Sequence, residues 1–198
     1  SEHKYGMAFD IGTTSIVGSL INLETGETLA DVGGVNPQAV YGGDLMSRIA
    51  YAQFDTKKLA TLRGKALNAI NDFVKDACQK AKIEPSHIYK IVIVGNTCMH
   101  HILLGVDVTY VGLAPYAPVI RDALTVPARD LPLKRAVNAQ VCFLPIVAGF
   151  VGADTMACVL ATRIYDSNEI RTLVDIGTNG EVVMGSKDGL MVCSAPAG

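Results

Sequence analysis

The stretch Phe9-Asp10-Ile11-Gly12-Thr13 returns 165 residues later as Val174-Asp175-Ile176-Gly177-Thr178. Each copy follows an apolar run and opens a pattern of short strands separated by turn residues. A single Asp-Ile-Gly-Thr sequence is compatible with an ordinary β-turn. Two copies in the same context instead predict a duplicated unit, one in each of two lobes that hold a ligand between them.

The repeated turn suits a polyphosphate. A glycine lets the backbone approach a ligand closely, so that turn N–H groups point at phosphate oxygens. Thr13, Thr14 and Ser15 add hydroxyl donors on one side, and Thr178 and Asn179 add polar groups on the other. The predicted contacts to the nucleotide are Gly12, Thr13, Thr14, Ser15, Asn96, Gly177, Thr178, Asn179 and Gly180.

An aspartate beside a phosphate is repulsive unless it also holds a cation. Mg²⁺ favours carboxylate and phosphate oxygens and keeps several of its waters. Asp10 and Asp175 are therefore predicted to hold Mg²⁺ through water, with ATP as the nucleotide. Glu181 is a candidate to point at the same metal from the second turn.

The spacing of apolar residues embeds the repeated turns in an α/β fold. We expect a mixed five-stranded sheet with helices on both faces, followed by the first strands of a similar lobe. Residues 106–137 contain four prolines and are interpreted as irregular. The predicted strands cover residues 5–9, 16–23, 28–34, 88–94, 141–144, 173–176, 181–184 and 190–193, and the predicted helices cover 56–82, 97–104 and 149–164.

Composition narrows the functional classes. The chain has 198 residues and a formal net charge of -2, which gives no electrostatic case for a nucleic-acid or anionic-membrane partner. No apolar run approaches the roughly 20 residues that a spanning helix needs. The five cysteines form no C-x-x-C pair, which argues against a zinc or iron–sulfur ligand set in these residues. We expect a protein of the reducing cytoplasm.

The motifs resemble those of the superfamily that contains actin, heat-shock chaperones and sugar kinases. DIGTTS (residues 10–15) resembles its first phosphate motif, and VDIGTNGE (174–181) resembles its second. The resemblance implies an actin-like, ribonuclease-H-like ATPase fold. It also implies a catalytic role for Asp154, which opens a predicted helix 21 residues before Asp175. The expected catalytic set is Asp10, Asp154 and Asp175, and the helix N-terminus should favour the ionised form of Asp154.

A closer resemblance spans nearly the whole chain. The segments that carry it are 6–26 (GMAFDIGTTSIVGSLINLETG), 36–52 (NPQAVYGGDLMSRIAYA), 92–105 (VIVGNTCMHHILLG), 113–119 (LAPYAPV), 144–162 (LPIVAGFVGADTMACVLAT) and 173–185 (LVDIGTNGEVVMG). Together they resemble the reductive activators of corrinoid proteins. Members of that family use ATP hydrolysis to drive one-electron reduction of Co(II) to Co(I) in a corrinoid methyl-transfer protein.

The resemblance implies an organisation as well as an activity. Residues 1–165 would form the first actin-like lobe, and residues 166–198 would begin the second, with the adenosine pocket beyond Gly198. The [2Fe-2S] cluster of the family would belong to a ferredoxin-like domain that is not in this chain. The implied partner is a corrinoid, cobalamin-dependent protein, and a homodimer is a candidate assembly.

Three questions stay open at the level of sequence. The first is the activity. Besides an ATPase, the protein could be a small-molecule kinase that uses the same cleft, with Asp154 deprotonating an acceptor hydroxyl. It could also be a non-catalytic domain that docks the corrinoid protein. Asn96 would either contact phosphate or form a strand-end turn. Asp44 and Arg48 are interpreted as a solvated ion pair on a short helix, with the cleft or a partner protein as alternatives.

Overall fold

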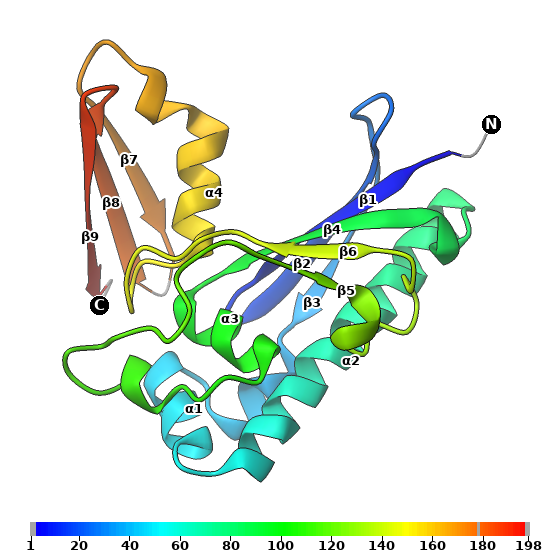
Figure 1. Ribbon diagram of the computed structural model, residues 1–198, viewed down its shortest axis with the longest axis horizontal. Helices are drawn as coiled ribbons and strands as arrows, with labels where there is room; N and C mark the ends of the chain where they lie inside the picture. The colour runs from blue at the N-terminus through cyan, green and yellow to red at the C-terminus, as the bar shows by residue number, and fades with distance from the viewer. Residues whose placement is uncertain (1–2, 178, 197–198) are drawn as a thin grey trace.

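The computed structural model describes residues 3–177 and 179–196 and contains two β-sheets (Figure 1). A six-stranded sheet has the order β3-β2-β1-β4-β6-β5, and a three-stranded sheet has the order β7-β8-β9. The strands are β1 (Tyr5–Ile11), β2 (Ser15–Asn22), β3 (Thr28–Val35), β4 (Ile88–Gly95), β5 (Leu124–Pro127), β6 (Gln140–Phe143), β7 (Arg171–Ile176), β8 (Asn179–Ser186) and β9 (Gly189–Pro196). The α-helices are α1 (Leu45–Ala52), α2 (Thr56–Ala81), α3 (Thr97–Leu104) and α4 (Ala153–Thr162).

The first sheet is mixed, as predicted. Strands β1, β2 and β3 form an antiparallel meander, whereas β4 runs parallel to β1 and β6 runs parallel to β4. The predicted count of five strands was one short, because β5 pairs antiparallel with β6 inside the segment interpreted as irregular. Strand β5 lies at the edge of the sheet and ends in Pro127, and edges tolerate proline because one side of the strand needs no partner.

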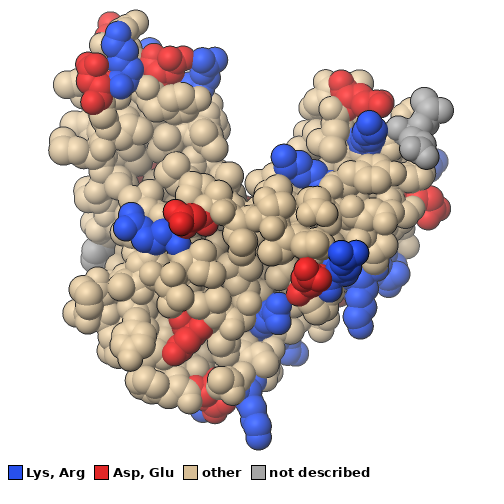
Figure 2. Space-filling view, viewed as in Figure 1, with Lys and Arg blue, Asp and Glu red and all other residues tan. Residues whose placement is uncertain are grey.

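Helix α2 covers one face of the first sheet. Its buried side chains recur at steps of three and four and include Leu62, Ile70 and Val74, as the apolar spacing predicted. They pack with Met7 and Ile91 of β1 and β4 in one core. Helix α4 stands beside the second sheet, meets the first sheet near the end of β4 and borders its other face across an open groove (Figure 1). Helices therefore lie on both sides of the sheet, as expected, but within the described residues only α2 packs along it; Val17 on the other face is 48% exposed. Between α4 and the sheet the surface is hollowed into a groove lined mainly by apolar side chains (Figure 2).

The second sheet repeats the meander of the first. Strands β7, β8 and β9 are antiparallel neighbours, so residues 173–175 open their meander as residues 5–10 open the first. The second sheet packs against α4 through a small cluster formed by Val159, Ile164 and Val183. No helix within the described residues has the length and apolar character needed to cross a membrane.

Helix α4 begins four residues later than predicted, at Ala153 instead of Gly149. Residues 148–151 form a tight turn instead, in which Ala148 and Val151 exchange backbone hydrogen bonds at 3.1 and 3.2 Å. This segment packs closely against other backbone: a Cβ on Gly149 would collide with the carbonyl oxygen of Tyr116, and one on Gly152 would lie 2.6 Å from Cα of Asn96. The start of α4 therefore lies beside the end of β4.

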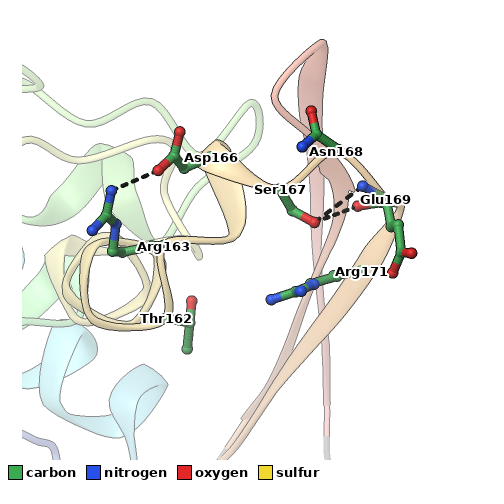
Figure 3. A pocket seen from close by; sticks show the side chains of 7 residues that line it. All are labelled: Thr162, Arg163, Asp166, Ser167, Asn168, Glu169 and Arg171. Atoms are coloured by element: carbon green, nitrogen blue, oxygen red, sulfur yellow. Dashed lines mark hydrogen bonds and ion pairs between the residues drawn. The ribbon is translucent and has the colours of Figure 1, made fainter.

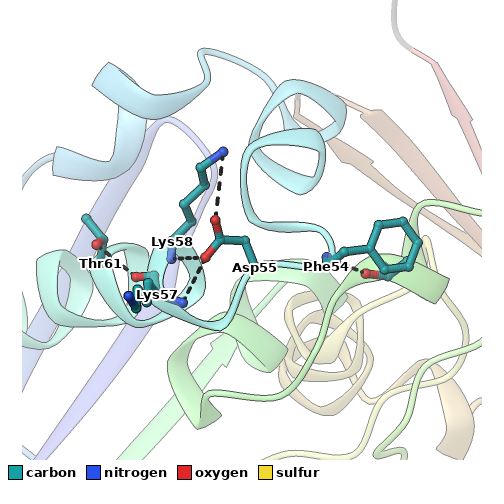
Figure 4. A network of polar contacts seen from close by, with 6 residues as sticks. Phe54, Asp55, Lys57, Lys58 and Thr61 are labelled. Atoms are coloured by element: carbon teal, nitrogen blue, oxygen red, sulfur yellow. Dashed lines mark hydrogen bonds and ion pairs between the residues drawn. The ribbon is translucent and has the colours of Figure 1, made fainter.

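Helix α2 begins at a well-defined cap (Figure 4). The Asp55 carboxylate accepts hydrogen bonds from the backbone N–H groups of Lys57 and Lys58, at 3.0 and 3.1 Å. The ammonium group of Lys58 is 4.0 Å from the same carboxylate, with both side chains largely exposed. An exposed ion pair of this kind contributes little, so the cap hydrogen bonds carry most of the stabilisation.

Asp55→Ala should lower the free energy of unfolding by about 1 kcal/mol, because it leaves the first N–H groups of α2 without their partner. Asp55→Asn should restore most of this loss, since its side-chain oxygen still accepts. Chemical denaturation measures both values. Lys58→Ala is the control, with an expected change below about 0.5 kcal/mol, and a larger loss in Lys58→Ala than in Asp55→Ala would contradict the assignment.

Candidate functional site

The first repeated turn joins β1 to β2 and is closed by one backbone hydrogen bond. The Gly12 N–H donates to the Ser15 carbonyl at 2.8 Å. A Cβ on Gly12 would lie 2.9 Å from that same oxygen, so the turn fits a glycine at this position. Asn36, which follows β3, holds the turn from behind. Its Nδ2 donates to the Gly12 carbonyl at 2.8 Å, and its N–H donates to the Thr14 carbonyl at 2.8 Å.

The second repeated turn joins β7 to β8 and is one residue tighter. Asp10 pairs across its hairpin with Val17, whereas Asp175 pairs with Glu181. The Gly177 N–H closes the turn by donating to the Asn179 carbonyl at 3.0 Å. The shorter turn brings a carboxylate, Glu181, to the position that valine occupies in the first copy. Thr178 lies outside the described residues.

The two turns face one another across a cleft of about 220 Å³. Nearly all of the residues predicted from sequence lie together there. Gly180 is the described exception: it is not part of the cleft lining and pairs with Ile176 at the start of β8. The cleft is lined by Asp10, Gly12, Thr13, Thr14, Ser15, Leu45, Asn96, Asp154, Asp175, Gly177, Asn179 and Glu181.

Asn96 has the backbone-bonded role, one of the two that the sequence left open, and it also lines the cleft. Its Oδ1 accepts from the Met99 N–H at 3.0 Å, so Asn96 is the N-cap of α3. Its Nδ2 donates to the Thr13 hydroxyl at 3.0 Å and so contacts the first turn. The hydroxyl of Thr97 donates to the Ala148 carbonyl at 2.7 Å, which ties α3 to the turn before α4.

The carboxylates of the cleft repel one another. Burial, helped by the charges of Asp154 and Asp175, raises the pKa of Asp10 from 3.8 to about 6, although solvent reaches its side chain from the open cleft. Burial also raises the pKa of Asp154; the Thr155 N–H bound to its carboxylate opposes this, and Asp175 adds to it. The expectation that the helix N-terminus would lower this pKa was therefore wrong, because burial outweighs it.

The pKa of Glu181, the fourth carboxylate of the cleft, is raised as well. Burial, followed by the charges of Asp154 and Asp175, raises the pKa of Glu181, while the hydrogen bond from the Ser194 hydroxyl to its Oε1, at 2.9 Å, opposes the rise. Such mutual repulsion favours either proton uptake or binding of a cation.

The donor set fits Mg²⁺ held through water better than a directly ligated metal. Within residues 3–177 and 179–196, no three histidine, cysteine or acidic side chains converge closely enough to bind a metal ion themselves. Four carboxylates nevertheless line one cleft. Mg²⁺ commonly binds one or two carboxylates and keeps waters for the rest of its shell. Asp10 and Asp175 remain the residues we expect to hold it.

Three features near the cleft were missed at the level of sequence. Leu45, the first residue of α1, lines the cleft. Cys158 lies one helical turn after Asp154, and its thiol is 3.8 Å from Oδ2 of Asp175. Asn36 supports the first turn from a buried position. Of the three, only Asn36 could have been predicted from the sequence, because asparagine directly after a strand commonly bonds to nearby backbone.

The interpretation of Asp44 and Arg48 as a solvated ion pair was wrong. Asp44 is the exposed N-cap of α1 and accepts from the Ser47 N–H at 2.9 Å. Arg48 is completely buried, and its guanidinium donates to the Gly42 carbonyl and to the side chain of Gln38. The four-residue spacing therefore reflects a helix cap and a buried side chain.

A second polar cavity, of about 410 Å³, lies where α4 connects to β7 (Figure 3). Arg163 pairs with Asp166 at 2.6 Å, and the Ser167 hydroxyl donates to the Glu169 carbonyl at 2.8 Å. The ion pair is largely exposed. The cavity lies on the exposed segment that joins α4 to β7. None of the candidate catalytic carboxylates lines it.

Comparison with known proteins points to one family. Residues 5–167 match the family described as the RACo middle region, and residues 169–198 match the C-terminal ASKHA domain of RACo. The corrinoid activation enzyme RamQ of Eubacterium limosum is 37% identical over 98% of this chain, and the [Co(II) methylated amine-specific corrinoid protein] reductase of Methanosarcina barkeri is 27% identical over 98%.

The structural comparison agrees with the sequence comparison. A solved reductive activator for a corrinoid, iron-sulfur protein superposes over all of this chain with a TM-score of 0.95 and 38% identity. The actin-like fold is therefore confirmed. The chain spans about a third of these relatives, 32% of RamQ, 36% of the reductase and 32% of the solved activator.

Asp10→Asn should stabilise the protein when no nucleotide or metal is present. Because its pKa is raised from 3.8 to about 6, Asp10 contributes stability below pH 3.8, and this is lost as the pH rises through 6. The variant should therefore unfold at a higher temperature than wild type above pH 6 and at the same temperature below pH 3.8.

Thermal unfolding measured across this pH range tests the prediction. Asp72→Asn, an exposed change on α2, is the control and should follow wild type at every pH. Equal unfolding temperatures for wild type and Asp10→Asn above pH 6 would contradict the repulsion described here.

Proposed function

Because the chain belongs to the RACo family and most of it corresponds to the middle region of RACo, we propose that it is the ATP-binding part of a reductive activator of corrinoid proteins. One observation carries the proposal: both repeated turns and Asp10, Asp154 and Asp175 line one cleft. The hydroxyl groups of the first turn and the Asn179 amide across the cleft suit a triphosphate, and the carboxylates suit its magnesium ion.

Different residues of the cleft would bind the phosphates and hold the metal ion. Thr13, Thr14 and Ser15 would donate to phosphate oxygens from the first lobe, and Asn179 would donate from the second. Gly12 and Gly177, whose N–H groups close the turns, would let the backbone approach the phosphates closely. Mg²⁺, when bound, would neutralise charge on the phosphate oxygens, with Asp10 and Asp175 holding its waters. Thr178 and Gly180 remain predicted contacts.

Asp154 would orient the attacking water and accept its proton. Burial raises its pKa, and a carboxylate with a raised pKa is the stronger base. Loose transition states for phosphoryl transfer gain most from positioning of the nucleophile, and Asp154 is fixed at the start of α4 by the hydrogen bond from the Thr155 N–H, at 2.8 Å.

ATP would act by changing the relation of the two lobes. We propose a first lobe over residues 1–165 and the start of a second over 166–198, which is consistent with family matches that meet between residues 167 and 169. A nucleotide shifts a conformational equilibrium only if it binds one state better than the other. A ligand that touches both turns meets this condition, because opening the lobes separates its contacts.

The coupled chemistry is one-electron reduction of Co(II) to Co(I) in a corrinoid methyl-transfer protein. This chain would supply the nucleotide-dependent change of shape, and the electron would come from a [2Fe-2S] domain outside it. Activity in the cytoplasm and assembly as a homodimer stay predictions of the sequence.

Two assays on the full-length protein test this function. Release of inorganic phosphate from ATP, without a phosphorylated small molecule, supports an ATPase, whereas a phosphorylated product would identify a kinase. Retention of a corrinoid protein that changes with ATP supports the proposed coupling. Nucleotide-independent retention by a protein without ATPase activity would identify a docking domain instead.

Asp154→Asn should lower ATP turnover by about 10²-fold or more, since it removes the proton acceptor while keeping the side-chain size. The affinity for ATP should stay close to wild type, because no phosphate contact is assigned to Asp154. Steady-state phosphate release and nucleotide titration measure the two quantities. Asp166→Asn, in the exposed ion pair beyond α4, is the control and should turn over normally. Normal turnover in Asp154→Asn would exclude Asp154 from catalysis.

A further inference from the structure

Arg48 is the largest side chain among those that are fully buried. Its Nε and Nη2 donate to the Gly42 carbonyl at 3.2 and 2.8 Å, and its Nη1 donates to Oε1 of Gln38 at 3.2 Å. None of the ion pairs within the described residues includes it. A buried guanidinium without a carboxylate at ion-pair distance is costly. The exposed Asp44 acts on it electrostatically but forms no ion pair with it.

The fold around Arg48 is built to hold this charge. Gly42 has a φ of 158°, and a Cβ on it would lie 2.6 Å from the backbone nitrogen of Arg48. Only a glycine brings its carbonyl so close to the guanidinium. Burial raises the pKa of the neighbouring Cys98 thiol to about 12, so that thiol stays neutral and does not balance the charge.

A chain of hydrogen bonds connects Arg48 to the first phosphate turn. Oε1 of Gln38 accepts from Arg48 and also lies 3.3 Å from Nδ2 of Asn36. The same Nδ2 donates to the Gly12 carbonyl at 2.8 Å. Asn36 and Gln38 are buried as completely as Arg48. Each side chain in such a chain polarises the next, and the low dielectric of the interior preserves the effect.

We propose that Arg48 is a positioning residue that supports polyphosphate binding from behind the first turn. Its charge favours anions at the turn, and its hydrogen bonds fix Asn36, which fixes Gly12. This inference rests on the nucleotide site proposed above and adds a determinant of specificity. The site should prefer triphosphate over uncharged adenosine by more than its direct contacts provide.

Two variants of the full-length protein remove the net charge by different routes. Arg48→Met replaces the guanidinium with an apolar chain, and Gln38→Glu gives the guanidinium a carboxylate partner in place. As a general measure, one unit charge acting on another over roughly 10 Å, at an effective dielectric constant of about 20, changes binding about tenfold. Both variants should therefore bind Mg-ATP about tenfold more weakly, while their affinity for adenosine stays at the wild-type value.

Two further variants serve as matched controls. Arg48→Lys keeps the charge and should bind Mg-ATP more tightly than Arg48→Met. Arg63→Met removes a cation that bonds to the Leu103 carbonyl away from the turns, and should leave the ratio of ATP affinity to adenosine affinity unchanged. Thermal unfolding identifies the variants that fold, and Gln38→Glu serves as the test if Arg48→Met does not.

Calorimetric titration with Mg-ATP and with adenosine gives the deciding ratio. A folded Arg48→Met or Gln38→Glu variant with the wild-type ratio overturns the inference and leaves the proposed function intact. An equal loss of affinity for both ligands also overturns it, because a purely structural role predicts that result. If the wild-type protein binds no Mg-ATP, the proposed function and this inference fall together.

Discussion

Repulsion among the carboxylates of one small cleft limits which ligands this protein can bind there. Asp10, Asp154, Asp175 and Glu181 line about 220 Å³ of space, and burial with mutual repulsion raises the pKa of Asp10 to about 6. Such a cluster is unfavourable until a cation enters, and a hydrated magnesium ion carrying a polyphosphate would relieve it. The hydroxyl groups of the first turn line the same space, and the Asn96 amide holds one of them, that of Thr13, in place.

The two turns share a motif but not a geometry. The turn after β1 is one residue longer, which leaves room for the hydroxyl-rich Thr13-Thr14-Ser15 segment, whereas the shorter turn after β7 brings Glu181 opposite Asp175. The first turn therefore contributes most of the donors, whereas the carboxylates come from both sides of the cleft: Asp10 and Asp154 from one, and Asp175 and Glu181 from the other. A ligand that carries both phosphate oxygens and a cation, as Mg-ATP does, would match both kinds of group.

Much of this arrangement was predictable, because the relevant signals are local. The cleft lining was predicted mainly from the two Asp-Ile-Gly-Thr repeats. The fold was predicted from the same repeats together with the apolar periodicity of α2 and the buried strand before Asn96. The errors arose where distant segments meet. Strand β5 forms because β6 offers it an edge, α4 starts late because the residues before it form a tight turn packed against Asn96 and Tyr116, and Arg48 is buried because Gly42 and Gln38 lie against it. A single sequence carries no local signal for such contacts.

The proposed function requires that one Mg-ATP is held by both turns. Hydrogen exchange at the backbone N–H groups of residues 12–15 and 177–180 in the full-length protein, with and without Mg-ATP, tests it most directly. If both turns hold the nucleotide, exchange slows in both segments over the same range of ATP concentration, while the exposed turn at residues 187–189 does not change. Slowing in only one of the two segments, or in neither at saturating ATP, would contradict it.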